Sequence, residues 1–307
     1  MSTDPTPTGR QGRRRLFLAV VTLLVSACAA HGAAVSTDPG PARPPATEMV
    51  RPAPVPRSTL TLPSGLVAGF ANLRAQLPGR MGLAVMAVGG DHVITLGDWT
   101  TGVAWSTIKV PLALAALRRD PVGLADVAQA AITASDNDAA QALWIALGGG
   151  EPAAEAVEAV LREAGDTTTD VADRHNPDAR QSIDDPMVFG ATPWSLVDQL
   201  RFAARLPCLH NASRVVDLMQ QITDSQSWGL GSFVGAEYKG GWGPDDDTGA
   251  YLVRQFGLVP TWSGQLAVAL AAQPDSGSYD DAVEMMDRMS ALLSEHVHEL
   301  HGGECER

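Results

Sequence analysis

A serine and a lysine in the segment 104–112 have the residue types and the spacing of a nucleophile and its base. Ser106 and Lys109 form an S-x-x-K sequence, and the apolar run that follows them predicts a buried helix. If Ser106 opens that helix, Lys109 lies one turn further along on the same face. A hydroxyl group beside an amine at a helix N-terminus predicts a serine nucleophile whose proton is taken up by lysine.

Lysine is otherwise almost absent from this chain. Among 22 basic residues, only Lys109 and Lys239 are lysines. Arginine does not give up its proton in a protein, and its guanidinium group is a broad fork rather than a compact point charge. Two positions that keep lysine in such a chain are therefore predicted to need lysine chemistry. The alternative, that Lys109 is only a surface charge, is disfavoured for this reason.

Two further segments carry residue types that suit a reaction site. Ser135, Asp136 and Asn137 stand directly before an apolar helical run, and Lys239 is followed by two glycines. Each segment alone has a structural explanation, because Ser, Asp and Asn are common N-caps of helices and glycine after a strand commonly marks a turn or a close approach of the backbone. Their order along one chain, after S-x-x-K, makes a shared site the more specific interpretation.

The hydrophobic pattern predicts the elements that must position these segments. Helical spacing and strand-like apolar runs follow one another with polar or glycine-rich connections between them. The predicted elements, in chain order, are a helix at 66–77, strands at 83–88 and 93–96, a block of helices over 106–226 that is broken by a polar loop at 166–186, strands at 233–239, 250–258 and 265–271, and a helix at 279–300.

This order of elements predicts an α+β fold. Short connections between strands indicate an antiparallel sheet of about five strands, which the N- and C-terminal helices would cover. The helical block, about residues 104–228, would be an insertion that forms an all-helical subdomain. A cleft between the two lobes is the expected place for a site.

The first 62 residues have the composition of a targeting segment and a linker. Arginines at 10 and 13–15 precede the apolar run 16–25, as in a secretory signal peptide. The sequence Val-Ser-Ala-Cys that ends at Cys28 resembles the lipobox of bacterial lipoproteins. This resemblance implies a signal peptide over 1–27, lipidation of Cys28, and export by the general or the twin-arginine route to the outer face of the bacterial cytoplasmic membrane. Prolines between 28 and 62 predict an extended linker, so the globular domain is expected over 63–307.

Charge and cysteine content restrict the partners. The formal net charge is −13, and loss of residues 1–27 would make it −16, because one aspartate and four arginines leave with them. Such an acidic chain disfavours binding to nucleic acid and electrostatic docking on anionic lipid. Cys208 and Cys305 either pair outside the cytoplasm or stay as free thiols. The C-terminal histidines indicate a solvated helix end, so no metal and no cofactor are expected, and the protein is expected to be a monomer.

The three segments together resemble the motifs S-x-x-K, S-D-N and K-[ST]-G of class A β-lactamases and penicillin-binding proteins. The resemblance extends over about residues 63–300 and is most detailed at 130–137. It implies the β-lactamase and DD-peptidase type of α+β fold, a serine hydrolase reaction, and a β-lactam or a cell-wall peptide as the substrate.

The resemblance also implies catalytic roles. Ser106 would be the nucleophile and Lys109 the base that accepts its proton. Ser135 would relay a proton to the leaving nitrogen. The backbone N–H groups of Ser106 and Trp242 would form the oxyanion hole.

Substrate binding is assigned by the same resemblance to Asn137 and to the strand with the second lysine. Asn137 would hold a substrate amide, and Lys239 would place positive charge where a substrate carboxylate lies. Gly241 matches the last position of K-[ST]-G, whereas Gly240 stands where that motif has a hydroxyl side chain. A group that helps to bind a substrate carboxylate is therefore missing.

A second departure concerns the hydrolysis of the acyl-enzyme. Class A enzymes have a glutamate after the helical block that activates the deacylating water, and Asn176 stands at that position. An amide does not accept a proton as a carboxylate does. Asp173 and Asp178 are alternative sources of a carboxylate. Only 28 residues separate Ser106 from Ser135, so part of one cleft wall is expected to be missing.

The sequence therefore predicts a lipid-anchored, extracytoplasmic serine hydrolase that is acylated on Ser106 and deacylated slowly. An alternative is a catalytically silent lipoprotein that keeps the fold in order to bind a cell-wall fragment or a partner. A third interpretation is an esterase that uses Ser106 and Lys109.

Overall fold

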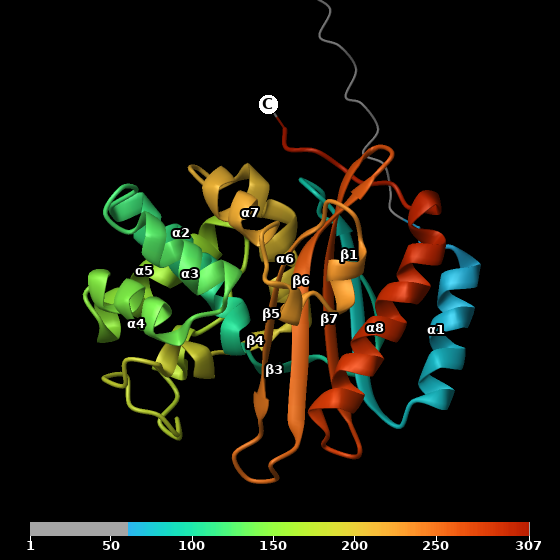
Figure 1. Cartoon of the computed structure of the whole chain (residues 1–307), viewed down its shortest axis with the longest axis horizontal. Coiled ribbons are helices and arrows are strands. Elements are labelled where there is room, and N and C mark those ends of the chain that lie inside the picture. The colour runs from blue at the N-terminus through green and yellow to red at the C-terminus, as the bar shows by residue number, and fades with distance from the viewer. Residues whose placement is uncertain (1–60, 307) are drawn as a thin grey trace, which may run out of the picture. The chain divides into compact units, whose positions relative to one another are not determined.

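A computed structural model describes residues 61–306 of the chain. The predicted signal peptide, the predicted lipidation site Cys28 and nearly all of the predicted linker lie outside the described residues. The described part has eight α-helices and a five-stranded antiparallel sheet, and the predicted α+β fold is confirmed (Figure 1). None of the described helices has the length and apolar character needed to cross a membrane.

The sheet has the strand order β2-β1-β7-β6-β5, and each neighbouring pair is antiparallel. Residues that face each other directly, such as Leu83 and Leu270 on β1 and β7, set the register at its centre. The strands are β1 (Gly79–Ala87), β2 (Ile94–Gly97), β5 (Glu237–Pro244), β6 (Tyr251–Thr261) and β7 (Gly264–Pro274).

One predicted strand begins later than expected. The strand expected at 233–239 is β5, Glu237–Pro244, because a 3-10 helix at Gly229–Ser232 and a positive φ of 78° at Gly235 keep the preceding residues in a turn. Lys239 and the glycines after it therefore lie inside a strand rather than at its end.

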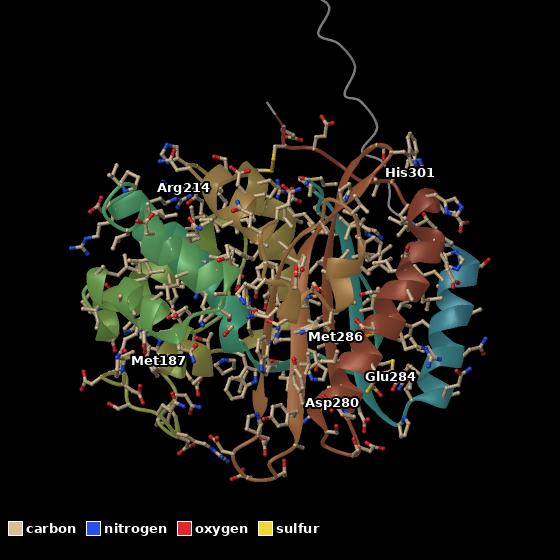
Figure 2. All side chains as sticks on the ribbon, in the orientation of Figure 1. Met187, Arg214, Asp280, Glu284, Met286 and His301 are labelled. Atoms are coloured by element: carbon tan, nitrogen blue, oxygen red, sulfur yellow. A yellow bond between two sulfur atoms is a disulfide. The ribbon has the colours of Figure 1, made fainter. Side chains whose placement is uncertain are left out.

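Helices cover both faces of the sheet, so its central strands are buried on both sides. Figure 1 shows α1 (Ser64–Gln76) and α8 (Tyr279–His296) side by side on one face, and Figure 2 shows Met286 of α8 beside the sheet. The residues of β1 alternate between the two cores. Met81, Leu83 and Val85 pack with α1 and α8, and Ala84 and Met86 pack with the helical block on the other face.

The other six helices lie between the first and last strands of the sheet in the sequence. They are α2 (Lys109–Arg119), α3 (Ala125–Thr133), α4 (Asn137–Ala146), α5 (Gly150–Glu163), α6 (Leu196–Arg205) and α7 (Ser213–Met219). β3 (Thr101–Val103) and β4 (Pro193–Ser195) form a separate two-stranded sheet. In the sequence, β3 comes before α2 and β4 comes after α5. The hydrophobic pattern did not predict this pair, because strands of three residues are too short to show a period.

A disulfide joins Cys208 to Cys305, with 5.3 Å between the Cα atoms. Cys208 follows α6, and Cys305 lies in the C-terminal segment after α8, near the C-terminus marked in Figure 1. The bond therefore ties the end of the chain to the helical side. Of the two states that the sequence left open for these cysteines, the structure has the disulfide.

Candidate active site

Ser106 lies in the connection between β3 and α2. A short 3-10 helix, Trp105–Ile108, carries the serine and continues directly into α2 at Lys109. Trp105 has a positive φ of 49°, an uncommon conformation for a residue with a side chain, and it turns the chain into the 3-10 helix. Ser106 is half-buried, whereas the side chain of Lys109 is buried, one turn further on as predicted.

The loop between α3 and α4 brings the S-D-N segment onto Lys109. Lys109 Nζ donates to the carbonyl oxygen of Ser135 (2.6 Å), to Asn137 Oδ1 (2.7 Å) and to the carbonyl oxygen of Asp136 (3.3 Å). Ser135 has a positive φ of 57°, and Asp136 caps α4 by accepting from the N–H of Ala139. The capping interpretation and the shared-site interpretation therefore both hold for this segment.

Lys239 reaches the same loop from the sheet. Its Nζ donates to Ser135 Oγ (2.9 Å) and to the carbonyl oxygen of Gly240 (2.9 Å), and its side chain is fully buried. Lys109 Nζ lies 3.5 Å from the same Ser135 hydroxyl. The two lysines, which are 130 positions apart in the sequence, thus meet at one serine.

Burial changes the protonation of both lysines. It lowers the pKa of Lys109 to about 8, against a smaller opposing effect of the negative charge of Asp136. Burial also lowers the pKa of Lys239 well below its usual value, and the positive charge of Lys109 lowers it further. With a pKa near 8, about a tenth of the Lys109 amine is neutral at pH 7, and this fraction, which can act as a general base, rises with pH.

The described residues show no hydrogen bond between Lys109 Nζ and Ser106 Oγ. A neutral amine has two N–H donors and one lone pair. The three bonds of Lys109 Nζ use all three donors of the protonated amine. Loss of its proton would leave the two short bonds in place, give up the 3.3 Å bond to the carbonyl oxygen of Asp136, and free the lone pair. The S-D-N loop thus fixes the amine of Lys109. Proton transfer from Ser106 Oγ to this amine requires that the two groups come closer together.

Glycine is required where β5 passes the 3-10 helix. A Cβ atom at Gly241 would lie 2.8 Å from the backbone nitrogen of Ser106 and 2.9 Å from the carbonyl oxygen of Ala104. A Cβ atom at Gly240 would lie 2.8 Å from the ring of Trp228. Contacts this short exclude a side chain at either position unless the neighbour moves. Gly241 therefore lets the strand approach Ser106, and Gly240 lets the ring of Trp228 pack on the strand.

Arg254 is a buried arginine that the sequence analysis did not single out, and it supports the segment between β3 and α2 that carries Ser106. Arg254 of β6 is fully buried and donates to carbonyl oxygens of Gly102, Val103 and Trp194, which belong to β3 and β4. It also donates to Gln199 Oε1, and burial lowers its pKa to about 9. These contacts include no carboxylate, so carbonyl oxygens and the ring of Trp99, whose centroid lies 5.0 Å from Arg254 Cζ, compensate the burial of the guanidinium.

Gln199 continues this support to the 3-10 helix. Its Nε2 donates to Thr107 Oγ1 (2.9 Å), and Thr107 Oγ1 donates to the carbonyl oxygen of Ala104 (2.6 Å). A chain of buried hydrogen bonds therefore links Arg254 to the residue that follows Ser106. A lone arginine within an apolar strand pattern was the only sequence signal for it.

A cavity of about 660 Å³ opens beside Ser106. Of the predicted site residues, Ser106, Lys109, Asn137 and Trp242 line it. The half-buried Ser135, which contacts both lysines, and the buried Lys239 do not line it. Apolar side chains that the sequence did not single out complete much of the wall, among them Trp99, Val103, Trp105, Met187, Phe189, Tyr251 and Leu252.

Asn176 lies outside this cavity. Its side chain is exposed, donates to Asp173 Oδ2 (2.7 Å) and accepts from the N–H of Asp178 (3.0 Å), and none of these three residues lines the cavity. The structure therefore does not bring the predicted deacylation position, or either alternative carboxylate, to Ser106.

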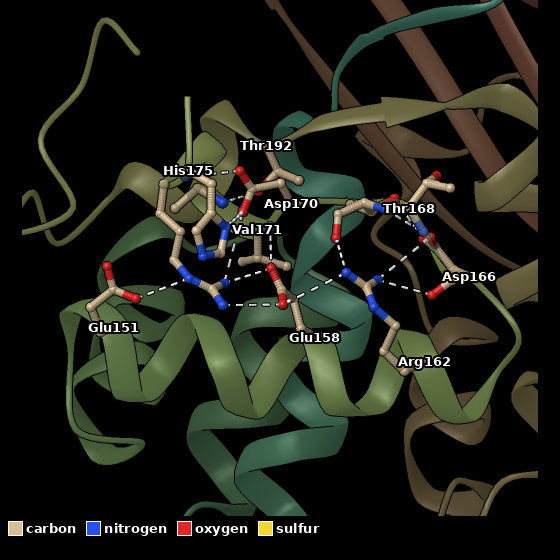
Figure 3. Close-up of polar contacts among 12 residues, drawn as sticks. Glu151, Glu158, Arg162, Asp166, Thr168, Asp170, Val171, His175 and Thr192 are labelled. Carbon is tan, nitrogen blue, oxygen red and sulfur yellow. Dashed lines mark hydrogen bonds and ion pairs between the residues drawn. The ribbon is translucent and has the colours of Figure 1, made fainter. Parts of the chain in front are cut away.

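An ionic network on α5 holds the loop that carries Asn176 (Figure 3). Arg174 pairs with Glu158 and Glu151, and Arg162 pairs with Glu158 and donates to the carbonyl oxygen of Thr169. Ala172 has a positive φ of 64° within this loop, and its N–H donates to Thr192 Oγ1. These contacts hold residues 169–174, the part of the loop that precedes Asn176.

Comparison with solved structures identifies the architecture. A class A β-lactamase from Mycobacterium abscessus matches with a TM-score of 0.56 and 16% identity, over 75% of this chain and 98% of that chain. A β-lactamase from Xanthomonas campestris matches at 0.57 and 17%, over 75% and 96%. An ancestral class A β-lactamase matches at 0.55 and 23%, over 75% and 99%.

Scans against protein-family models and against curated proteins find no match. The structural matches nevertheless cover nearly the whole length of their own chains. The resemblance that the three motifs gave in the sequence is therefore confirmed at the level of the fold: this chain has the fold of the serine β-lactamases of class A.

Proposed function

We propose that this protein is a serine hydrolase of the β-lactamase and penicillin-binding type that forms an acyl-enzyme on Ser106. The observation that carries the proposal is the convergence of Lys109, Ser135, Asn137 and Lys239 within hydrogen-bond distance of one another, beside a cavity that Ser106 lines. The β-lactamase neighbours make β-lactams the first substrates to test, with cell-wall peptides as the second class.

Acylation follows from these positions. Ser106 Oγ attacks the substrate carbonyl carbon, and its proton passes to the neutral amine of Lys109. The bond from the carbonyl carbon to the leaving nitrogen then breaks, and the hydroxyl proton of Ser135 goes to that nitrogen. Lys239 holds Ser135 Oγ at 2.9 Å, and Lys109 returns a proton to Ser135 across 3.5 Å. Asn137, at the edge of the cavity, is placed to bind a substrate amide.

Deacylation is proposed to be slow. A water molecule needs a base to attack an ester such as the acyl-enzyme. Asn176, Asp173 and Asp178 do not line the cavity, and the carboxylates that do line it, Asp185, Asp245 and Asp246, are exposed to solvent. The acyl group would therefore stay on Ser106 long enough to be detected.

Export and lipid anchoring are part of the proposal. They rest on the basic start, the apolar run and the lipobox-like end of residues 1–28. Metabolic labelling with an alkyne-tagged fatty acid in a bacterial host should mark the full chain and not the Cys28→Ser variant. Equal labelling of both would remove Cys28 as the lipidation site.

Intact-mass spectrometry tests the acylation. The full chain and its Ser106→Ala variant would be exposed to benzylpenicillin and, separately, to an uncharged alkyl fluorophosphonate that labels reactive serines. An adduct on the unmodified chain alone, with either reagent, supports the proposal. Rapid penicillin hydrolysis without an adduct would support acylation and contradict slow deacylation. No reaction with either reagent contradicts the proposed activity.

A catalytically silent binding protein is the second candidate. The observation that favours it is the engagement of Lys109 by the S-D-N loop, with no hydrogen bond from its Nζ to Ser106 Oγ. In that case the cavity would bind a cell-wall fragment or partner without chemistry. Reversible penicillin binding by calorimetry, unchanged in Ser106→Ala and without an adduct, would favour this candidate.

A further inference from the structure

The contacts around the second lysine and the cavity walls bear on the charge of the substrate. Lys239 is the residue expected to face a substrate carboxylate, yet its Nζ is fully buried and already donates to Ser135 Oγ and to the carbonyl oxygen of Gly240. It does not line the cavity. Since burial and the nearby Lys109 lower its pKa, its positive charge is also reduced.

An aromatic ring takes the place of a polar group next to this lysine. The ring of Trp228 packs so closely on Gly240 that a Cβ atom there would lie 2.8 Å from it. Trp228 in turn packs edge-to-face on Trp242, with ring centroids 6.0 Å apart, and Trp242 lines the cavity. Of the two rings only that of Trp242 lines the cavity, so a carboxylate bound beside β5 would meet this ring, and Gly240 offers it no hydroxyl donor.

Apart from Lys109 and a few uncharged polar side chains, the cavity wall consists of apolar residues and of exposed charged residues that are mostly acidic. The exposed residues Asp185, Asp245 and Asp246 line it, and the exposed cation that lines it, Arg180, is paired with Asp247. An anion in the cavity would thus meet three carboxylates. The aromatic and aliphatic residues that offer contact area inside are Trp99, Trp105, Phe189, Trp242, Tyr251 and Leu252.

We infer that the acyl donor for Ser106 is an uncharged amide or ester with an aromatic or other bulky apolar group, and that the site disfavours substrates that carry a carboxylate. This inference rests on the proposed acylation of Ser106. In the reaction the C–N or C–O bond of the donor breaks, its acyl carbon bonds to Ser106 Oγ, and the departing amine or alcohol carries away one proton. Water later returns the acyl group as a carboxylic acid.

The carboxylates that line the cavity favour release of that acid. Hydrolysis of a neutral ester or amide creates a carboxylate in the cavity, where the exposed carboxylates and the apolar wall disfavour it. The same features that disfavour an anionic substrate would therefore favour departure of an anionic product.

Benzylpenicillin and its methyl ester form a matched pair for the test, because they share the reactive amide and the phenyl group and differ in the carboxylate. Acylation rates of the full chain would be measured by intact mass and divided by each compound's rate of alkaline hydrolysis. We expect the ester to acylate Ser106 at least tenfold faster. Equal rates, or a faster reaction of the acid, would overturn the inference.

A variant of the exposed carboxylates tests the cause of the preference. In the double variant Asp185→Asn and Asp246→Asn, the acid should react several-fold faster, while the ester should change by less than about twofold. The asparagine at 185 keeps an acceptor for the N–H of Met187, which contacts Asp185 Oδ1 at 2.8 Å. A change that is equal for both compounds would show that these carboxylates act through something other than charge and would overturn this part of the inference.

Labelling with the fluorophosphonate distinguishes failure of the inferred substrate preference from failure of the proposed function. If Ser106 is labelled but the acid outpaces the ester, the proposed function stands and the inference fails. If Ser106 reacts with neither the fluorophosphonate nor either penicillin, both fail.

Discussion

Lys109 and Lys239 approach one hydroxyl group, Ser135 Oγ, to 3.5 and 2.9 Å. They are the only lysines in the chain, and one comes from a helix while the other comes from the sheet. Because both amines are buried, a full positive charge on each of them is disfavoured. The pair therefore holds a proton acceptor ready beside Ser106, and this relationship leads to the first two predictions.

Acylation of Ser106 should rise with pH through about 8. Burial lowers the pKa of Lys109 to about 8, so the amine is protonated below this pH and becomes a base above it. The rate of labelling by the fluorophosphonate, measured between pH 6 and 10 and corrected with Ser106→Ala, should increase about tenfold per pH unit below 8 and then level off. A rate that is constant or falls over this range would rule out Lys109 as the base.

Lys109→Arg should lower the rate of acylation by about 10²–10⁴-fold, the range of a lost general base. Arginine keeps the positive charge but does not give up its proton near neutral pH. Thermal unfolding of the variant would establish that it folds. A binding protein without chemistry should keep its affinity for benzylpenicillin in this variant, so a large loss of acylation with retained binding assigns Lys109 to the reaction. Unchanged acylation would contradict that assignment.

Gly241→Ala should separate β5 from the 3-10 helix. The new methyl group would lie 2.8 Å from the backbone nitrogen of Ser106, so the free energy of unfolding should fall by about 1–3 kcal/mol and acylation should slow at least tenfold. Gly190→Ala is the matched stability control, because a Cβ atom there meets nothing within 4 Å. Denaturant unfolding of both variants measures the difference, and equal stability would contradict the tight approach.

Asn176→Glu should leave deacylation unchanged within about twofold. Position 176 is exposed, and its side chain bonds within its own loop to Asp173 and Asp178. A carboxylate there would not reach a water molecule beside Ser106. Decay of the penicillin adduct, followed by intact mass, measures the rate. Decay more than tenfold faster in the variant would show that the loop moves its side chain into the cavity.

Cys305→Ser should destabilise the fold by about 2–4 kcal/mol, because the disulfide to Cys208 closes a long loop of the unfolded chain. Cys208→Ser should lower the unfolding free energy by the same amount, and the double variant should lose no more than either single variant. Denaturant unfolding without reductant measures all three. Additive losses in the double variant would mean that the cysteines act separately.

Most of the fold and the reactive residues could be predicted from the sequence. Helical spacing and apolar runs are local, so Leu66, Phe70 and Leu73 predicted α1 and the apolar run at 83–88 predicted β1. The rarity of lysine and the order of three short motifs singled out Ser106, Lys109, Ser135 and Lys239 before any contact was known. The structure places these residues together.

Only the tertiary structure decided the details that bear on substrate and turnover. Contacts between Trp228 and Gly240, or between Arg254 and the carbonyl oxygens of β3 and β4, join residues far apart in the chain and leave no local pattern. Likewise, the motif resemblance put Asn176 at a reaction position, whereas in the structure its side chain is exposed and bonds to Asp173 of its own loop. A sequence determines which groups are present and which local elements form, but packing decides which of those groups face the same cavity.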